Sequence, residues 1–165
     1  MNQKELMLLD WMRKIHQLEY AHCFQSLYFS NVEKIIGVGA FVLSTAVAFT
    51  YRFPFIGYPW VKEYVLPFIL FIVAILTGYQ SFIKPGEKAE THRKLGIEYE
   101  KIRHEIETLL TGKLEDPKLD NYISKVKSKW DTLNTLYVNQ RHYDDAKAKV
   151  KSSNKYLKEL DFIKA

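Results

Sequence analysis

The chain has 165 residues, a formal net charge of +5 and a single cysteine. Its length allows one domain at most, and the lone cysteine excludes an internal disulfide and fits a reducing compartment. Charged residues gather toward the two ends, while the middle of the chain is apolar. This division predicts an all-α membrane protein with polar ends.

Residues 1–31 are expected to form a cytoplasmic helix that leads into the membrane. Charges interrupt every apolar stretch there, so we expect no cleavable signal, and the first span should act as an anchor. The helix needs a partner for its apolar stripe, and the charged helix expected after the second span stands at the same membrane face. The stripe has helical spacing and consists of Leu8, Trp11, Met12, Ile15, Leu18 and His22.

Two runs without charged side chains, residues 35–51 and 64–83, predict transmembrane helices at residues 32–52 and 64–84. The second contains twenty consecutive uncharged residues, which reach about 30 Å in a helix, the thickness of the hydrocarbon core. The first contains seventeen, at the short end of the spanning range. Prolines and aromatic residues in the intervening segment, 53–63, suit an extracytoplasmic loop near the headgroups. The alternative is a buried helical hairpin in a soluble protein.

Lys and Arg are distributed unevenly around the spans. The loop between them has two, Arg52 and Lys62, whereas the twenty residues after the second span have six. Because such an excess marks the cytoplasmic side, we expect both termini in the cytoplasm. From Lys113 onward there are twelve Lys or Arg and eight Asp or Glu, a balance that favours contact with an anionic inner leaflet. No nucleic-acid-binding motif occurs, so nucleic acid is not expected as a partner.

Small residues recur along both spans at the spacing that lets helix backbones approach closely. In lipid this close approach favours helix association. Such faces suit packing either within the hairpin or between protomers, and we expect a homo-oligomer. The small residues are Gly37, Ala40, Ser44 and Ala48 in the first span and Ala74 and Gly78 in the second.

Polar side chains within the spans are candidates for lining a pore. Serine and threonine hydroxyls often bond their own helix backbone, whereas Gln80 needs a lumen, a neighbouring helix or the interface. The absence of a charge inside the spans argues against a pump or a coupled transporter. The candidate pore-lining residues are Ser44, Thr45, Thr77, Gln80 and Ser81.

Lys84, Pro85 and Gly86 connect the second span to a charged cytoplasmic helix expected at residues 85–112. Proline is favoured at the first helical position, and this short link is a candidate gating junction. The helix that follows carries a heptad seam, too short for an autonomous coiled coil, so we expect it to pack in a bundle or a short coiled coil. The seam is His92, Leu95, Tyr99, Ile102, Ile106 and Leu109.

Residues 113–165 are expected to form a basic helical region. A turn follows Gly112, and a second apolar seam then runs for nearly three heptads: Leu119, Ile123, Val126, Trp130, Leu133 and Tyr137. Beyond Asn139 the pattern weakens, and a further helix broken near residues 152–154 is allowed by Ala146, Val150, Leu157, Leu160 and Ile163.

No catalytic site, metal site or cofactor is expected. The chain lacks a phosphate-binding loop, a zinc-protease helix and a nucleophile elbow. Glu19 and His22 form one E-x-x-H pair, but di-iron bundles require two such pairs and two further glutamates. We therefore expect a structural role for His22 and His92, at the membrane-facing end of the bundle.

Residues 66–107 resemble the second span and following helix of the SLATT family, whose members show T-G-x-Q-x-F-x-x-P-x-E-K-A-E-x-H-R and then G-x-x-Y-x-x-I/L-R-x-x-I-E. The likeness covers roughly residues 8–110, and it departs from the family in lacking a proline after Gly37. The matching residues are Thr77, Gly78, Gln80, Phe82, Pro85, Glu87, Lys88, Ala89, Glu90, His92, Arg93, Gly96, Tyr99, Ile102 and Arg103, with Ala21, His22, Gly37, Leu43 and Ser44 upstream.

The resemblance implies an oligomeric two-span effector of the bacterial inner membrane, associated with nucleotide-signalling and antiviral conflict systems. Such proteins are proposed to form a gated pore that permeabilises the membrane of an infected cell in abortive infection. The cytoplasmic helices would then receive a signal from a cytosolic nucleotide-signalling sensor or another activator protein. The alternative is a non-conducting membrane scaffold that recruits a cytosolic partner through its helical bundle. We do not expect an enzyme.

Overall fold

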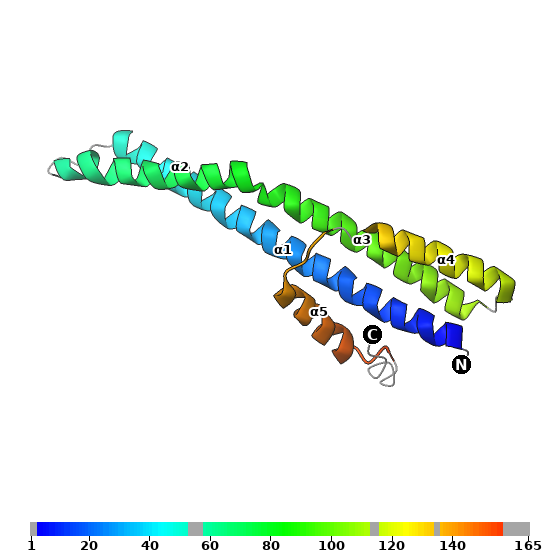
Figure 1. The fold of residues 1–165 in the computed structure, drawn as a ribbon. Coiled ribbons are helices and arrows are strands. Elements are labelled where there is room, and N and C mark those ends of the chain that lie inside the picture. Colours follow the sequence, from blue (N-terminus) through cyan, green and yellow to red (C-terminus); the bar gives the residue numbers. More distant parts are fainter. Residues whose placement is uncertain (1–2, 53–57, 113–115, 134–135, 157–165) are drawn as a thin grey trace. The chain divides into compact units, whose positions relative to one another are not determined.

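A computed structural model describes residues 3–52, 58–112, 116–133 and 136–156. These residues are almost entirely helical and contain no strand, which confirms the expected all-α class. Figure 1 shows the helices in chain order. They are α1 (Gln3–Arg52), the π-helical turn η1 (Val61–Val65), α2 (Leu66–Ile83), α3 (Pro85–Thr111), α4 (Asp116–Leu133) and α5 (Gln140–Ser152).

The chain divides into two compact units. We call Met1–Ser26 together with Glu90–Ala165 the bundle, and Leu27–Ala89 the hairpin. Both α1 and α3 contribute residues to each unit. Each of these two helices therefore changes its packing partners part-way along its length, while its backbone hydrogen bonds continue without a break.

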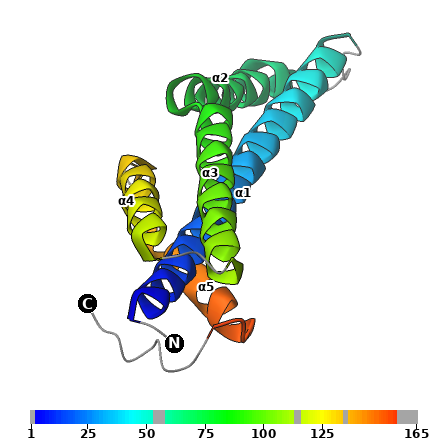
Figure 2. The ribbon, with the colours of Figure 1, turned by 90° about the vertical axis from the view of Figure 1, so that its right-hand side faces the viewer.

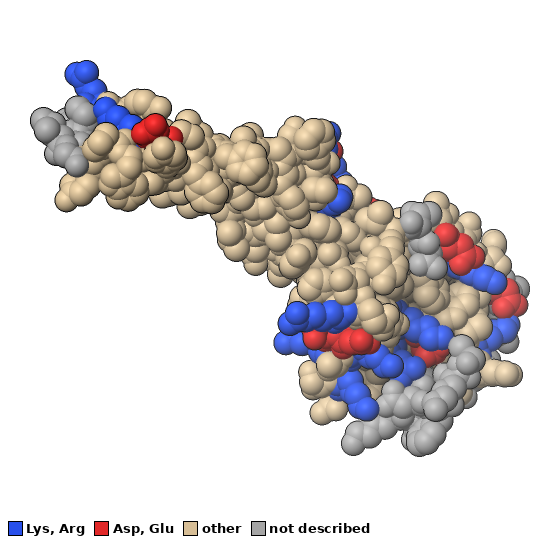
Figure 3. Space-filling model, turned by 60° about the vertical axis from the view of Figure 1, so that its left-hand side comes forward, with Lys and Arg blue, Asp and Glu red and all other residues tan. Residues whose placement is uncertain are grey.

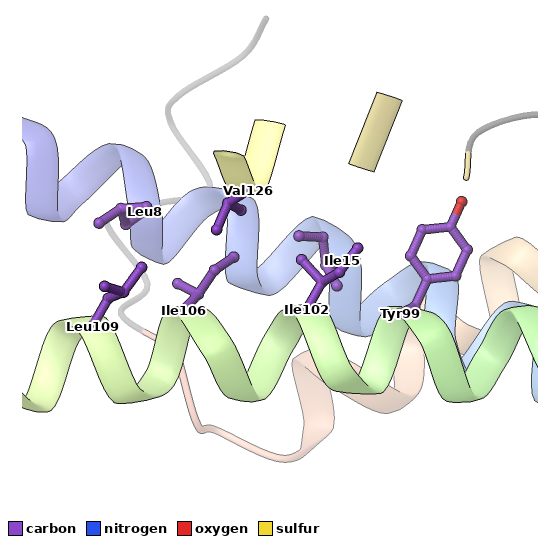
Figure 4. Close-up of a cluster of buried hydrophobic side chains, with 7 residues drawn as sticks. All are labelled: Leu8, Ile15, Tyr99, Ile102, Ile106, Leu109 and Val126. Carbon is purple, nitrogen blue, oxygen red and sulfur yellow. The ribbon is translucent and has the colours of Figure 1, made fainter. Parts of the chain in front are cut away.

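The described residues of the bundle form one apolar core, and the heptad positions of α3 contribute one side of it. Leu8 and Ile15 from α1 lie against the α3 seam, and Val126 of α4 completes the cluster (Figure 4). Ile15 and Ile106 are fully buried, and burying one such side chain is worth about 1.5–3 kcal/mol. The partly buried residues around the cluster are Trp11, Met12, Leu18, Leu95, Leu110, Leu119, Ile123, Trp130 and Leu133.

The second apolar seam ends earlier than its spacing predicts. α4 ends at Leu133, and Tyr137 lies outside the helix with 82% of its surface exposed. The placement of Tyr137 in the seam is therefore wrong. Its physical reason is local, because Asn139 caps the next helix and accepts a hydrogen bond from the Arg141 amide at 3.0 Å.

Helix α5 is attached to the bundle mainly through polar contacts near its two ends. The Asn139 amide donates to Gln25 Oε1 at 3.1 Å, and the Tyr156 hydroxyl lies 3.0 Å from Nδ1 of His16. Within α5 only Ala146 and Val150 are buried, and Figure 2 shows the helix (orange) on the other side of α1 from α4 (yellow). The helix ends at Ser152, near the expected break, while Leu157, Leu160 and Ile163 lie outside the described residues.

Candidate functional site

The hairpin carries the apolar surface that the sequence assigns to the membrane. Two helical stretches, Gln3–Arg52 and Val61–Thr111, are long and apolar enough to cross a bilayer, and only 6% of the apolar window of each is buried. Figure 3 shows a broad area without Lys, Arg, Asp or Glu on the face that it draws. A core helix of a soluble protein buries most of such a window. This chain leaves that surface for lipid or another subunit to cover.

Large apolar side chains account for most of that exposed surface. Phe41 in α1 is 71% exposed and Phe82 in α2 is 87% exposed. In lipid, each such side chain favours insertion by about 0.3–0.6 kcal/mol, whereas in water it would promote aggregation. The others are Ile35, Val38, Val42 and Phe49 in α1 and Phe68, Leu70, Phe71 and Ile75 in α2.

Three of the four hydroxyl groups among the candidate pore-lining residues are satisfied by their own helices. Ser44, Thr45 and Thr77 each donate to the carbonyl four residues earlier, at 2.7 Å for Ser44 and at 2.8 Å for Thr45 and Thr77. Ser44, Thr77 and Ser81 are exposed. Because these side chains face outward, any lumen that they line requires several copies.

Gln80, the remaining pore-lining candidate, instead joins the two spans. Its Nε2 atom donates to the backbone carbonyl of Glu33 at 3.3 Å. A Cβ atom at Gly37 would lie 3.1 Å from that same nitrogen, so the missing side chain makes room for the amide. Glu33 is not among the predicted site residues, since its only signal in the sequence is a charge one turn before the small residue Gly37.

Most of the predicted small-residue positions lie outside the contact between the two spans. Ser44, Ala48 and Ala74 are exposed, and a Cβ atom added at Gly78 would meet nothing within 4 Å. Ala40 is partly buried. Packing between protomers therefore stays a prediction for these residues, whereas only Gly37 is used within the hairpin.

The predicted junction is a break between two helices. α2 ends with Lys84 in the left-handed region (φ 49°, ψ 57°), and its amide donates to the Gln80 carbonyl at 3.0 Å. Pro85, which has no amide hydrogen to donate, is buried and begins α3. A Cβ atom at Gly86 would lie 2.2 Å from a carboxylate oxygen of Glu33. The α1 side chain thus lies directly against the first turn of α3.

A buried pair of histidines connects α1 and α3 within the bundle. Nδ1 of His22 lies 2.9 Å from Nδ1 of His92, and the ring of Tyr99 stacks on His22 at 5.3 Å. Burial, reinforced by His92, lowers the pKa of His22 to about 4. Burial, reinforced by His142, also lowers the pKa of His92. Both rings are therefore neutral at pH 7, and the Nδ1–H of one ring donates a hydrogen bond to the Nδ1 of the other.

The E-x-x-H pair does not form a metal centre in this arrangement. Glu19 accepts from Nε of Arg103 at 2.7 Å, and both side chains are mostly buried. His22 turns instead to His92. Among the residues that the structure describes, no group of three or more His, Cys, Asp or Glu side chains is placed to hold a metal ion.

No protein-family model, curated protein or solved structure matches this chain. The resemblance to the SLATT family therefore stays a prediction from the residues quoted above.

Proposed function

We propose that this chain is a two-span membrane protein whose copies assemble into a gated pore. The observation that carries the membrane assignment is the 6% burial of two apolar windows long enough to cross a bilayer. The uneven distribution of Lys and Arg, six after the second span and two between the spans, supports a cytoplasmic location for both termini.

Exposed small and polar residues on the spans support assembly. Ala48 and Ala74 lie on the outside of the hairpin, where a second copy would approach closely. Ser44 and Thr77 share that exposure, and a lumen built from several copies would collect them. The SLATT resemblance adds the setting: the bacterial inner membrane, antiviral defence, and a cytosolic activator.

The junction at Lys84, Pro85 and Gly86 is proposed to couple the bundle to the spans. Because Glu33 of α1 packs against Gly86, a displacement of α3 would be transmitted to both spans of the hairpin. Replacing Pro85 and Gly86 together by alanine should therefore change conductance or toxicity. Unchanged values for both would refute this coupling.

A non-conducting scaffold is the second candidate. It is favoured by the hydroxyl groups that bond their own helices, since residues satisfied in this way tolerate lipid and need no lumen. In that case the bundle, with its charged exterior, would recruit a cytosolic partner.

Ion flux through the purified full-length protein in dye-loaded liposomes separates the two functions. The test variant carries Ser44→Leu and Thr77→Leu, which remove two exposed hydroxyls without touching Gln80. The matched control carries Ala46→Leu and Tyr79→Leu, exposed positions two residues farther along each span and therefore on roughly the opposite helix face.

A pore predicts flux in the wild type and in the control variant, with loss in the test variant. Equal flux in both variants would exclude Ser44 and Thr77 from the lumen. Vesicles that stay tight with all three proteins, once crosslinking has shown that oligomers form, indicate either the scaffold or a pore that stays closed without its cytosolic activator.

A further inference from the structure

A groove on the bundle has no role in the membrane function proposed above. It lies between α3 and α4 and has a volume of about 700 Å³, within the range of small-molecule binding sites. Both helices belong to the bundle. Its lining residues are Lys101, His104, Glu105, Thr108 and Leu109 from α3 and Tyr122, Lys125, Val126 and Lys129 from α4.

The charges around the groove are strongly biased toward cations. Three lysines face a single acidic residue, Glu105, which is already paired with Lys129. Lys101 pairs with Glu98, which does not line the groove. Lys125 makes no ion pair with any residue that the structure describes. An ammonium group without a counterion at the edge of a cavity attracts an anion.

The rest of the lining offers an apolar contact beside that charge. Leu109 and Val126 are 9% and 2% exposed and belong to the bundle core (Figure 4). Tyr122 is 45% exposed, so much of its ring is open to a ligand. Aromatic side chains pack on flat rings in offset or edge-to-face arrangements, and lysine binds phosphate as a point charge.

We propose that this groove binds a small soluble molecule that combines an anionic group, such as phosphate, with an aromatic body. The anionic group lies at Lys125, and the aromatic ring packs against Tyr122, one turn away on α4. Binding there bridges α3 and α4, the two helices that bury Val126 between them. The site lies wholly in the bundle, so its existence does not depend on whether the hairpin conducts ions.

Calorimetric titration of the full-length protein in phosphatidylcholine nanodiscs tests the site. The probes are phenyl phosphate, which carries both the anion and the ring, inorganic phosphate, which carries only the anion, and phenol, which carries only the ring. Phenyl phosphate should bind saturably and about tenfold more tightly than either fragment, which corresponds to about 1.4 kcal/mol. Lys125→Glu should weaken phenyl phosphate by at least about tenfold, and Tyr122→Ala should remove the preference over inorganic phosphate.

The matched control is Lys127→Glu, the same charge change on an exposed α4 residue outside the groove. It should leave the phenyl phosphate affinity within about twofold. Equal losses of phenyl phosphate affinity in both lysine variants would show that only the net charge of the bundle matters, and would overturn the site. The absence of saturable binding would overturn it as well. Circular dichroism verifies that each variant keeps its helical content.

A lipid headgroup offers the same anionic group, and nanodiscs that contain phosphatidylglycerol separate the two sources. For a soluble ligand, phenyl phosphate should bind equally well in both kinds of nanodisc at matched ionic strength. If phosphatidylglycerol abolishes that binding, the groove is a lipid site and the proposal of a soluble aromatic ligand is wrong.

Discussion

The bundle and the hairpin are built from the same kind of helix, and α1 and α3 take part in both. In the bundle, Ile15 and Ile106 are fully buried, and the charged side chains that are mostly buried, such as Glu19 and Arg103, are paired with each other. In the hairpin, Phe71 and Phe82 are 62% and 87% exposed. Both regions are helical and form the same kind of backbone hydrogen bonds. They differ in the environment, water or hydrocarbon, to which their surfaces are suited. Water suits the first, and hydrocarbon suits the second.

Lowering the pH should produce the largest difference in stability between the bundle and the hairpin. All five histidines belong to the bundle, and Leu27–Ala89 has none. Burial, reinforced by Arg103, lowers the pKa of His16 to about 4, and that of His22 falls to the same value. Between pH 6.5 and 4 the unfolded chain therefore binds more protons than the folded one, so the bundle loses stability as pH falls. At pH 4 the loss is about 3 kcal/mol for each histidine.

The measurement is chemical unfolding in zwitterionic micelles at pH 7 and pH 4. Fluorescence of Trp11 and Trp130, whose rings meet edge to face at 5.8 Å, follows the bundle. His22→Asn should remove only part of the difference between the two pH values, because His16 and His92, whose pKa values are also lowered by burial, still titrate. A bundle that is equally stable at both pH values would contradict the burial of neutral histidines.

Truncation of a large apolar side chain should have opposite consequences in the two regions. Ile106→Ala leaves a cavity in the bundle core and should lower the free energy of unfolding by about 2–5 kcal/mol. Phe82→Ala removes an exposed side chain and should change it by less than about 1 kcal/mol in micelles, since no cavity forms. Comparable losses in both variants would mean that Phe82 is packed against protein.

Glycine substitutions should distinguish the junction from the interior of α3. Lys84 has a positive φ, a conformation that glycine adopts without strain, so Lys84→Gly should stabilise the chain by up to about 1 kcal/mol. Lys94→Gly, at an exposed position inside α3, should destabilise it by about 1 kcal/mol. Thermal unfolding of both variants checks the sign. Destabilisation by Lys84→Gly would show that the lysine side chain itself holds the junction.

The smallest expected effect concerns the contact between the two spans. A Cβ atom at Gly37 would press on the Gln80 amide, whereas one at Gly39 would meet nothing within 4 Å. Gly39→Ala should therefore gain the helix preference of alanine, while Gly37→Ala should stay about 0.5–1 kcal/mol less stable than Gly39→Ala. Unfolding by sodium dodecyl sulfate in micelles measures this difference. It should vanish when Gln80 is also replaced by alanine.

Several features of the fold could be predicted because they depend on local chemistry. Pro85 begins α3 because proline suits a first helical position, and Arg52 ends α1 where the uncharged run ends. The heptad spacing of Tyr99, Ile102 and Ile106 indicated one face of a helix, and all three are buried. Tyr137 shows where spacing fails, since apolar periodicity does not record that the helix has already ended.

The packing of the N-terminal apolar stripe against the α3 seam was predicted and is confirmed, but individual hydrogen bonds between residues far apart in the sequence could not be predicted. Gln80 and Glu33 are 47 positions apart, and Asn139 and Gln25 are 114 apart. A buried polar side chain needs a hydrogen-bond partner. The amino-acid sequence does not identify which of the many donors and acceptors in the chain will lie near it. The interpretation of Gln80 as a pore residue rested on that need alone.

The sequence by itself determined the helical class, the two apolar runs and the apolar face of each helix in the bundle, because periodicity and charge act over a few residues. Only the tertiary structure decided which groups meet: His22 with His92, Gln80 with Glu33, and Lys129 with Glu105 at the groove between α3 and α4. Helix formation needs neighbours in the chain, whereas burial and hydrogen bonding between helices depend on how the helices pack.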